Sequence, residues 1–340
     1  MGQQAIVPVL PAARGPLSEA LLEELRRPAH ALALTAPRTD DVLGDEDVQL
    51  SLYLCYELHY RGLDGVDERW EWEPSLLGLR AELEDGFERA VREAVGSPFA
   101  APSPEESDRA LRAIADADDG PSLSRHLARE GTEEQMLEFM VHRSAYQLKE
   151  ADPHSWGLPR LTGKPKAAMV QIQADEYGGG KANRIHAEMY ARSLQAVGLS
   201  PDYGAYLDHI PASTLATVNL MSLFGLHRRL RGALVGHLAL FEMSSAIPSR
   251  RYGDALRRLG RPQAALFFDE HVEADAVHEN IAAVDLAGGL IRQEPALGPD
   301  VMFGAEALGE LDRRSAEHVM GCWSAGESSL RRPLHMPAAA

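Results

Sequence analysis

The sequence predicts an all-α protein built as a helical bundle. Ala, Leu, Glu and Arg recur throughout the 340 residues, and these residue types favour helices. No internal repeat is present, and no β-type alternation is long enough to build a sheet. Because 45% of the residues are hydrophobic and only 6% are aromatic, we expect a sizeable and mainly aliphatic core.

The chain divides into four predicted regions. They are an irregular arm rich in Pro, Ala and Thr over residues 1–45, an N-terminal helical region over 46–130, the main helical domain over 131–328, and a loose tail over 329–340. The arm contains one short predicted helix around residues 18–27. Pro8 and Pro11 interrupt its apolar run, which therefore makes a poor signal peptide.

Capping residues and helix breakers delimit the predicted helices. Ser122 can cap a helix that Gly131 ends, Thr132 and Gln135 can form a capping box, and Pro153 ends the helix that follows. The predicted helices cover residues 45–62, 76–95, 105–117, 120–131, 132–152, 164–176, 181–197, 211–230, 231–245, 263–290 and 299–323.

The segment HVEADAVH carries the strongest local pattern. His271, Asp275 and His278 are spaced i, i+4 and i+7, so they share one face of a helix over about two turns. Two imidazoles and a carboxylate suit Fe(II) and leave coordination positions open for oxygen. The competing interpretation is a solvated acidic face, which fits Glu270, Glu273 and Glu279 better because charged groups are seldom buried without a partner.

Two further segments carry candidate ligands. In DEYGGGKANRIH, Glu176 closes one helix and His186 follows after three glycines, which imply a sharp turn or close packing. This segment lacks the Lys-Ser/Thr pair of a phosphate-binding loop. In QLKEADPH, Glu150 lies near the end of a helix with an apolar side, and Glu138 and His154 are its rivals.

A helical bundle can bring these residues together, because carboxylates and imidazoles from facing helices meet in its interior. Three carboxylates and three histidines would neutralise much of the charge of two Fe(II) ions. Zinc is a poorer match, since zinc sites usually use fewer ligands and one metal. The three segments therefore supply candidate ligands for a two-iron site, with Glu138 and His154 still open as rivals to Glu150.

These segments resemble the heme-oxygenase-like diiron oxidases and oxygenases, a family of iron-containing redox enzymes. The resemblance covers roughly residues 130–325 and rests on QLKEADPHSWGLPRLTGKPKAAMVQIQADEYGGG, HAEMYARSLQAVGL, LATVNLMSLFGLHRRLRGALVGHLALFEM and FFDEHVEADAVHE. It implies a heme-oxygenase-like bundle, O₂ as co-substrate and an external reductant. Carried over residue by residue, it also implies two Fe(II) ions bound by Glu150, Glu176, His186, His271, Asp275 and His278. It also implies that no heme is bound.

The resemblance favours N-oxygenation of an amine or guanidine group on an amino-acid-derived substrate in a biosynthetic pathway. Oxidative C–C cleavage or desaturation of an amino or fatty acid is the alternative oxidation. A non-catalytic iron-binding helical protein is the alternative from another class. Among other polar residues, His237 and Glu242 are interpreted either as pocket-lining groups or as a hydrogen-bonded core pair.

Charge and composition limit the partners that we expect. A formal net charge of −17 repels phosphate backbones and makes nucleic acid an unsuitable partner. No uncharged apolar run approaches the length of a membrane span, so we expect a cytoplasmic protein without a membrane partner. The expected partners are a small-molecule substrate and an electron donor, and a homodimer through the N-terminal helices is a further hypothesis.

Overall fold

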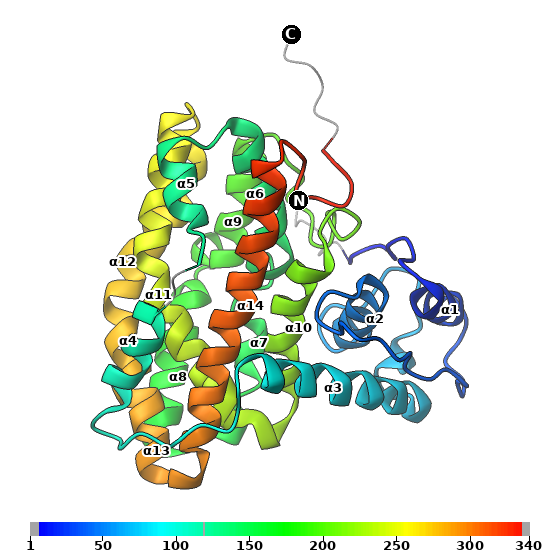
Figure 1. Cartoon of the computed structure of the whole chain (residues 1–340), viewed down its shortest axis with the longest axis horizontal. Helices are drawn as coiled ribbons and strands as arrows, with labels where there is room; N and C mark the ends of the chain where they lie inside the picture. The colour runs from blue at the N-terminus through cyan, green and yellow to red at the C-terminus, as the bar shows by residue number, and fades with distance from the viewer. Residues whose placement is uncertain (1–6, 118–119, 335–340) are drawn as a thin grey trace.

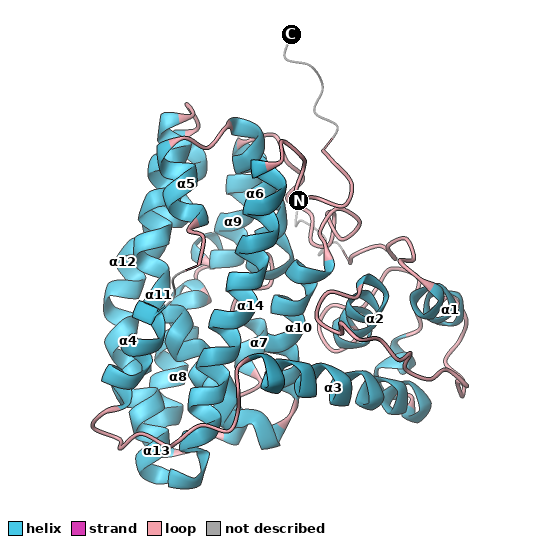
Figure 2. Cartoon of the chain, in the orientation of Figure 1, coloured by secondary structure: helices cyan, strands magenta, loops and turns pink. Residues whose placement is uncertain are grey.

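The protein is a helical bundle with a smaller helical layer against one side (Figure 1). The computed structural model describes residues 7–117 and 120–334, without the side chains of residues 273–277. Over these described ranges every regular element is a helix and no strand occurs (Figure 2). The predicted all-α fold class is therefore confirmed.

The α-helices are α1 (Pro16–Leu25), α2 (Glu46–Glu57), α3 (Pro74–Ala94), α4 (Ser107–Ala117), α5 (Leu123–Arg129), α6 (Glu133–Gln147), α7 (Asp152–Ser155), α8 (Gly163–Glu176), α9 (His186–Ala196), α10 (Ala212–Leu226), α11 (Arg231–Arg258), α12 (Leu266–Asn280), α13 (Gly289–Gln293) and α14 (Gly298–Ser324). Short 3₁₀ turns and one π-helical segment, η7 (Ile281–Gly288), connect them. The predicted caps at Ser122 and Thr132 are present, and Thr132 and Gln135 form the reciprocal capping box.

Helix α11 is the central element of the bundle. It packs along α14 and α12 and also contacts α5. The sequence predicted that this helix ends at residue 245, but it continues through Pro248 to Arg258. A proline removes one helical N–H, so the local preference favours a break. Packing against α5 and α12 overrides that preference, which sequence patterns alone do not reveal.

Two other predicted helices differ at their ends. The predicted helix over 263–290 is divided into α12, the π-helical segment η7 and α13. The π-helical turns begin three residues after His278, and such local widening of a helix is frequent at functional sites. The predicted helix over 181–197 begins only at His186, because the preceding residues form tight 3₁₀ turns.

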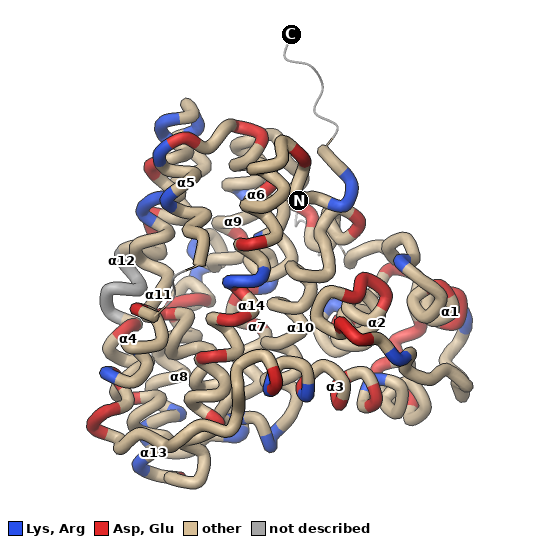
Figure 3. Tube along the Cα trace, viewed as in Figure 1, with Lys and Arg blue, Asp and Glu red and all other residues tan. Residues whose placement is uncertain are grey.

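Helices α1, α2 and α3 form the side layer, in which α2 packs on α10 and α3 on α14 (Figure 1). Helices α4 and α5, which the sequence grouped with α2 and α3, contact α11 instead. In the described part of the chain, no helix is both long and apolar enough to cross a bilayer. Lysine and arginine are interspersed with acidic residues along both parts (Figure 3).

A buried ion pair joins the side layer to the bundle. Lys149 Nζ lies 3.2 Å from Glu57 Oε2 and 4.3 Å from the centre of the Tyr60 ring. Tyr203 donates its hydroxyl hydrogen to the same Glu57 oxygen at 2.6 Å. Since Lys149 directly precedes Glu150, these contacts help to fix the end of α6, where a candidate metal ligand lies.

Helices α11 and α14 approach each other through glycines. A Cβ atom on Gly304 would lie 1.9 Å from the carbonyl oxygen of Ala233. A Cβ atom on Gly236 would lie 1.8 Å from the carbonyl oxygen of Val301. Both obstacles are backbone atoms, so a side chain can be accommodated only if the two helices move apart.

We expect Gly304→Ala to lower the free energy of unfolding by about 1–3 kcal/mol, because the close helix contact has to open. Gly309→Ala is the matched control, since it lies in the same helix and a Cβ atom there meets nothing within 4 Å. That change should raise the free energy of unfolding by about 0.5–1 kcal/mol through helix propensity. Urea denaturation measures both, and equal effects would contradict the close contact.

Candidate metal centre

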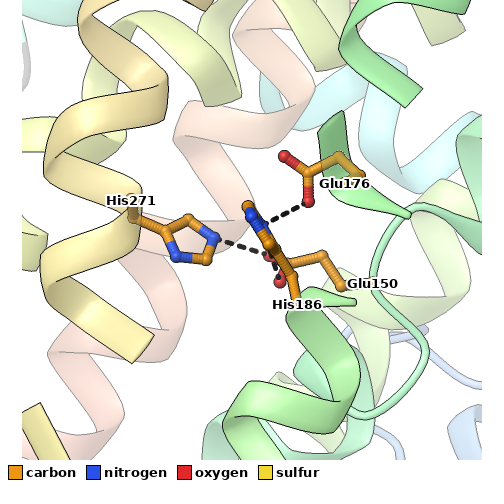
Figure 4. A group of neighbouring side chains, drawn as sticks. All are labelled: Glu150, Glu176, His186 and His271. Atoms are coloured by element: carbon orange, nitrogen blue, oxygen red, sulfur yellow. Dashed lines mark ion pairs between the residues drawn. The ribbon is translucent and has the colours of Figure 1, made fainter. Parts of the chain in front are cut away.

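Four buried side chains with metal-binding atoms meet inside the bundle (Figure 4). Glu150 follows the end of α6, Glu176 ends α8, His186 begins α9 and His271 lies on α12. One donor atom from each lies within 4.8 Å of the others. Segments that are far apart in the sequence therefore supply a compact set of two carboxylates and two imidazoles.

A second group adjoins the first and shares Glu176 with it. Donor atoms of Glu176, Glu242 and His278 also lie within 4.8 Å of one another, and all three residues are buried. Glu242, on α11, is absent from the predicted ligand set. His237, its proposed hydrogen-bonding partner, instead pairs with His154 at 3.1 Å. Glu242 escaped detection because it stands alone in an apolar helix, without a spacing pattern to single it out.

Five of the six predicted ligands thus converge on these two groups. The sixth, Asp275, belongs to α12, but its side chain lies outside the described residues. Glu138, the rival candidate to Glu150, is not part of either donor group. It accepts hydrogen bonds from Trp323 Nε1 at 2.8 Å and from Ser329 N at 2.9 Å.

Two tight turns bring the carboxylates to the centre. Ala151, directly after Glu150, adopts a φ of 74°, which is rare for a residue with a side chain. Gln173 Nε2 donates a hydrogen bond to the Ala151 carbonyl at 2.7 Å and so fixes this turn against α8. At Gly178 a Cβ atom would lie 2.6 Å from the carbonyl carbon of Arg184, which confirms the close packing predicted for the glycine run.

Hydrogen bonds orient the imidazole rings. His271 Nδ1 donates to the Phe267 carbonyl, one helical turn earlier, at 2.9 Å, and its Nε2 faces Glu150 Oε1 at 3.4 Å. His278 Nε2 lies 3.0 Å from Asp175 Oδ2, while its Nδ1 lies 3.2 Å from Glu242 Oε2. With one ring nitrogen held by such a partner, the other is directed toward the donor groups.

Gln147, the last residue of α6, supports Glu150 in the same way. With its amide nitrogen turned toward the carboxylate, it donates to Glu150 Oε1 at 2.6 Å. Neither Gln147 nor Asp175 was predicted as part of the site. Glutamine and aspartate are common on protein surfaces, so the sequence gives no reason to single them out. Only the folded structure shows that Gln147 contacts Glu150 and that Asp175 contacts His278.

The donor set suits a pair of divalent cations. Glu176 Oε2 and His186 Nδ1 lie 2.8 Å apart, yet within the described residues neither atom makes a hydrogen bond. Buried polar atoms without partners are costly, and a cation between them would satisfy both. Mixed carboxylate and imidazole donors match iron, and a carboxylate shared by two groups matches a two-metal site.

Comparison with known proteins agrees with this chemistry. The model of the iron-containing redox enzyme family matches residues 137–313, just over half of the chain. The chain belongs to this family. It is therefore an iron-dependent oxidoreductase, as the resemblance implied.

A curated relative of this oxidoreductase is nitrosourea synthase from Streptomyces achromogenes subsp. streptozoticus. The two are 26% identical over 198 residues, which make up 56% of this chain and 41% of the relative. The chain thus spans less than half the length of that protein. The similarity concerns this stretch only.

Without a bound cation, the environment of the site shifts the pKa of several donor groups away from its ordinary value. Burial, with the Glu242 carboxylate nearby, raises the pKa of Glu176 to about 8, and burial also raises the pKa of Glu150. Burial alone would lower the pKa of His278, but hydrogen bonds to Glu242 and Asp175 raise it to about 9. Burial and the neighbouring His271 lower the pKa of His186 to about 4.

For the metal-free protein we expect Tm to fall as the pH rises from about 6.5 to 9. In this window Glu176 and His278 keep protons that their unfolded counterparts have lost, because both pKa values are raised on folding. The folded state then binds more protons than the unfolded state and loses stability as the pH rises. Thermal unfolding in chelator over this range measures the effect.

The His278→Gln variant is the comparison for the predicted fall of Tm with pH in the metal-free protein. It removes one of the two titrating groups and should flatten the decline of Tm with pH. A Tm that rises between pH 6.5 and 9 in the metal-free wild type would contradict the raised pKa values of Glu176 and His278.

Proposed function

We propose that the protein is a non-heme diiron oxygenase that uses O₂ and an external reductant to oxygenate nitrogen. Its substrate is the amine or guanidine group of an amino-acid-derived molecule in a biosynthetic pathway. In the balanced reaction, one oxygen atom forms the new N–O bond and the other leaves as water. The reductant supplies two electrons, and two protons are taken up.

The observation that carries the proposal is the pair of donor groups that share Glu176. Glu150 and His271, with His186, would hold one ion, and Glu242 and His278 would hold the other. Bound iron supplies the capacity to bind and reduce O₂. The relative supports nitrogen as the target, because its name denotes the synthesis of a nitrosourea, a compound with a nitrogen–oxygen bond.

The protein surrounding these donors restricts access of water. A space of only about 10 Å³ remains between the donor groups, and Tyr146, Leu238 and Phe241 line it. All three side chains present mainly apolar surface, which strengthens electrostatic interactions within the site. Gln147 and Asp175 hold Glu150 and His278 from outside the donor groups.

The test is anaerobic loading with Fe(II), followed by O₂, a reductant and a panel of amines and guanidines, with products identified by mass spectrometry. We expect a product that gains one oxygen atom on nitrogen. Glu242→Gln should lower its yield by about 100-fold or more, because a ligand of the second ion is lost. Glu188→Gln, an exposed change on α9, should leave the yield unchanged.

The alternative oxidations would give products of different mass. Loss of a carbon fragment would support C–C cleavage, and loss of two hydrogens would support desaturation, and either would overturn N-oxygenation. Full product yield from Glu242→Gln would contradict the role of the second donor group.

A further inference from the structure

A cavity of about 230 Å³ lies next to the candidate metal centre. At its inner end, His271 and Phe241 line both this cavity and the small space between the metal donors. At its outer end, Ser122, Ser124 and Pro248 line both this cavity and a larger hollow of about 840 Å³. The cavity thus lies between the outer hollow and the donors, where a substrate would have to bind.

Arg143 is the residue of interest in this cavity. It lies on α6, one turn before Gln147, so these two residues share one face of the helix, and Glu150 follows just beyond the helix end. Its guanidinium group lines the cavity, with Cζ 6.0 Å from the centre of the Phe139 ring. No hydrogen bond or ion pair among the described residues holds this group.

Arg143 is only partly buried and lines the cavity, so a ligand that enters the cavity can reach its guanidinium group. Burial by itself would lower the pKa of Arg143, but the Asp312 carboxylate raises it above the ordinary value. The group is therefore a permanent cation. Asp312, on α14, lines the same cavity, so the wall carries both signs of charge.

We propose that Arg143 binds the carboxylate of an α-amino-acid substrate and so directs the substrate's side chain toward His271 and the metal donors. The proposal rests on the proposed function and narrows its substrate class. A planar guanidinium group matches a carboxylate through two parallel hydrogen bonds. The Asp312 carboxylate complements the ammonium group of the same zwitterion.

Two features favour an amino acid over a phosphate. A phosphate would add two negative charges beside Asp312 and the buried glutamates, whereas a zwitterion brings its own compensating cation. Arg143 also lies roughly 6 Å along α6 from Gln147, the last residue of the helix, and Glu150 follows beyond that end. A long amino acid with a terminal nitrogen, such as lysine or arginine, can span such a distance.

The test is a double-mutant-type cycle that measures binding affinity while Arg143 is substituted in the protein and the carboxylate is replaced by an amide in the ligand. Calorimetry on the iron-loaded, anaerobic protein would compare L-arginine with L-argininamide and L-lysine with L-lysinamide. Of L-arginine and L-lysine, we take the amino acid that binds more tightly. We expect wild type to bind it about 10- to 100-fold more tightly than the corresponding amide. Arg143→Gln should abolish that preference while the affinity for the amide changes little, and Arg143→Lys should retain part of it.

Arg314→Gln is the matched control, because Arg314 is a half-exposed arginine of α14 that pairs with Glu310 outside the cavity. It should leave the preference intact. Equal binding of acid and amide by wild type, no saturable binding of either amino acid, or an equal loss for both ligands in Arg143→Gln would overturn the proposal. If the carboxylate preference holds but no oxygenated product forms, the proposed function fails and the role of Arg143 stands.

Discussion

Three buried carboxylates that lie next to three buried imidazoles are the constraint on which the rest of this structure depends. Glu150, Glu176 and Glu242 are almost excluded from water. Burial, with a second carboxylate nearby, raises the pKa of both Glu150 and Glu176, so ionising these two acids is costly. Bound divalent cations would offset this cost directly, which explains why the bundle keeps acidic groups at its centre.

The scaffold holds the donors through backbone features more than through side-chain size. Gly304 lets α14 approach α11, which carries Glu242, and Gly178 allows the tight turn between α8 and α9. The left-handed backbone of Ala151 turns the chain after Glu150. The turns at Ala151 and Gly178 direct the chain next to Glu150 and Glu176, and the contact at Gly304 sets how closely α14 packs on α11, so the geometry of the centre depends on backbone packing.

The sequence predicted the all-α class and the donors that stand in recognisable patterns. His271 and His278 were found because their spacing defines one helix face, and Glu176 and His186 because they flank a glycine run. Glu242 and Gln147 could not be found in this way, since each depends on which helices face each other. The continuation of α11 through Pro248 was missed for the same reason, because tertiary packing overrode the local preference.

Anomalous X-ray diffraction at the iron edge, on crystals loaded anaerobically with Fe(II), would locate the proposed pair of ions without reference to any activity. We expect two iron peaks for each chain, one beside Glu150 and His271 and the other beside Glu242 and His278, with Glu176 between them. A single peak away from these residues, or no peak in fully folded protein, would contradict the two-metal centre.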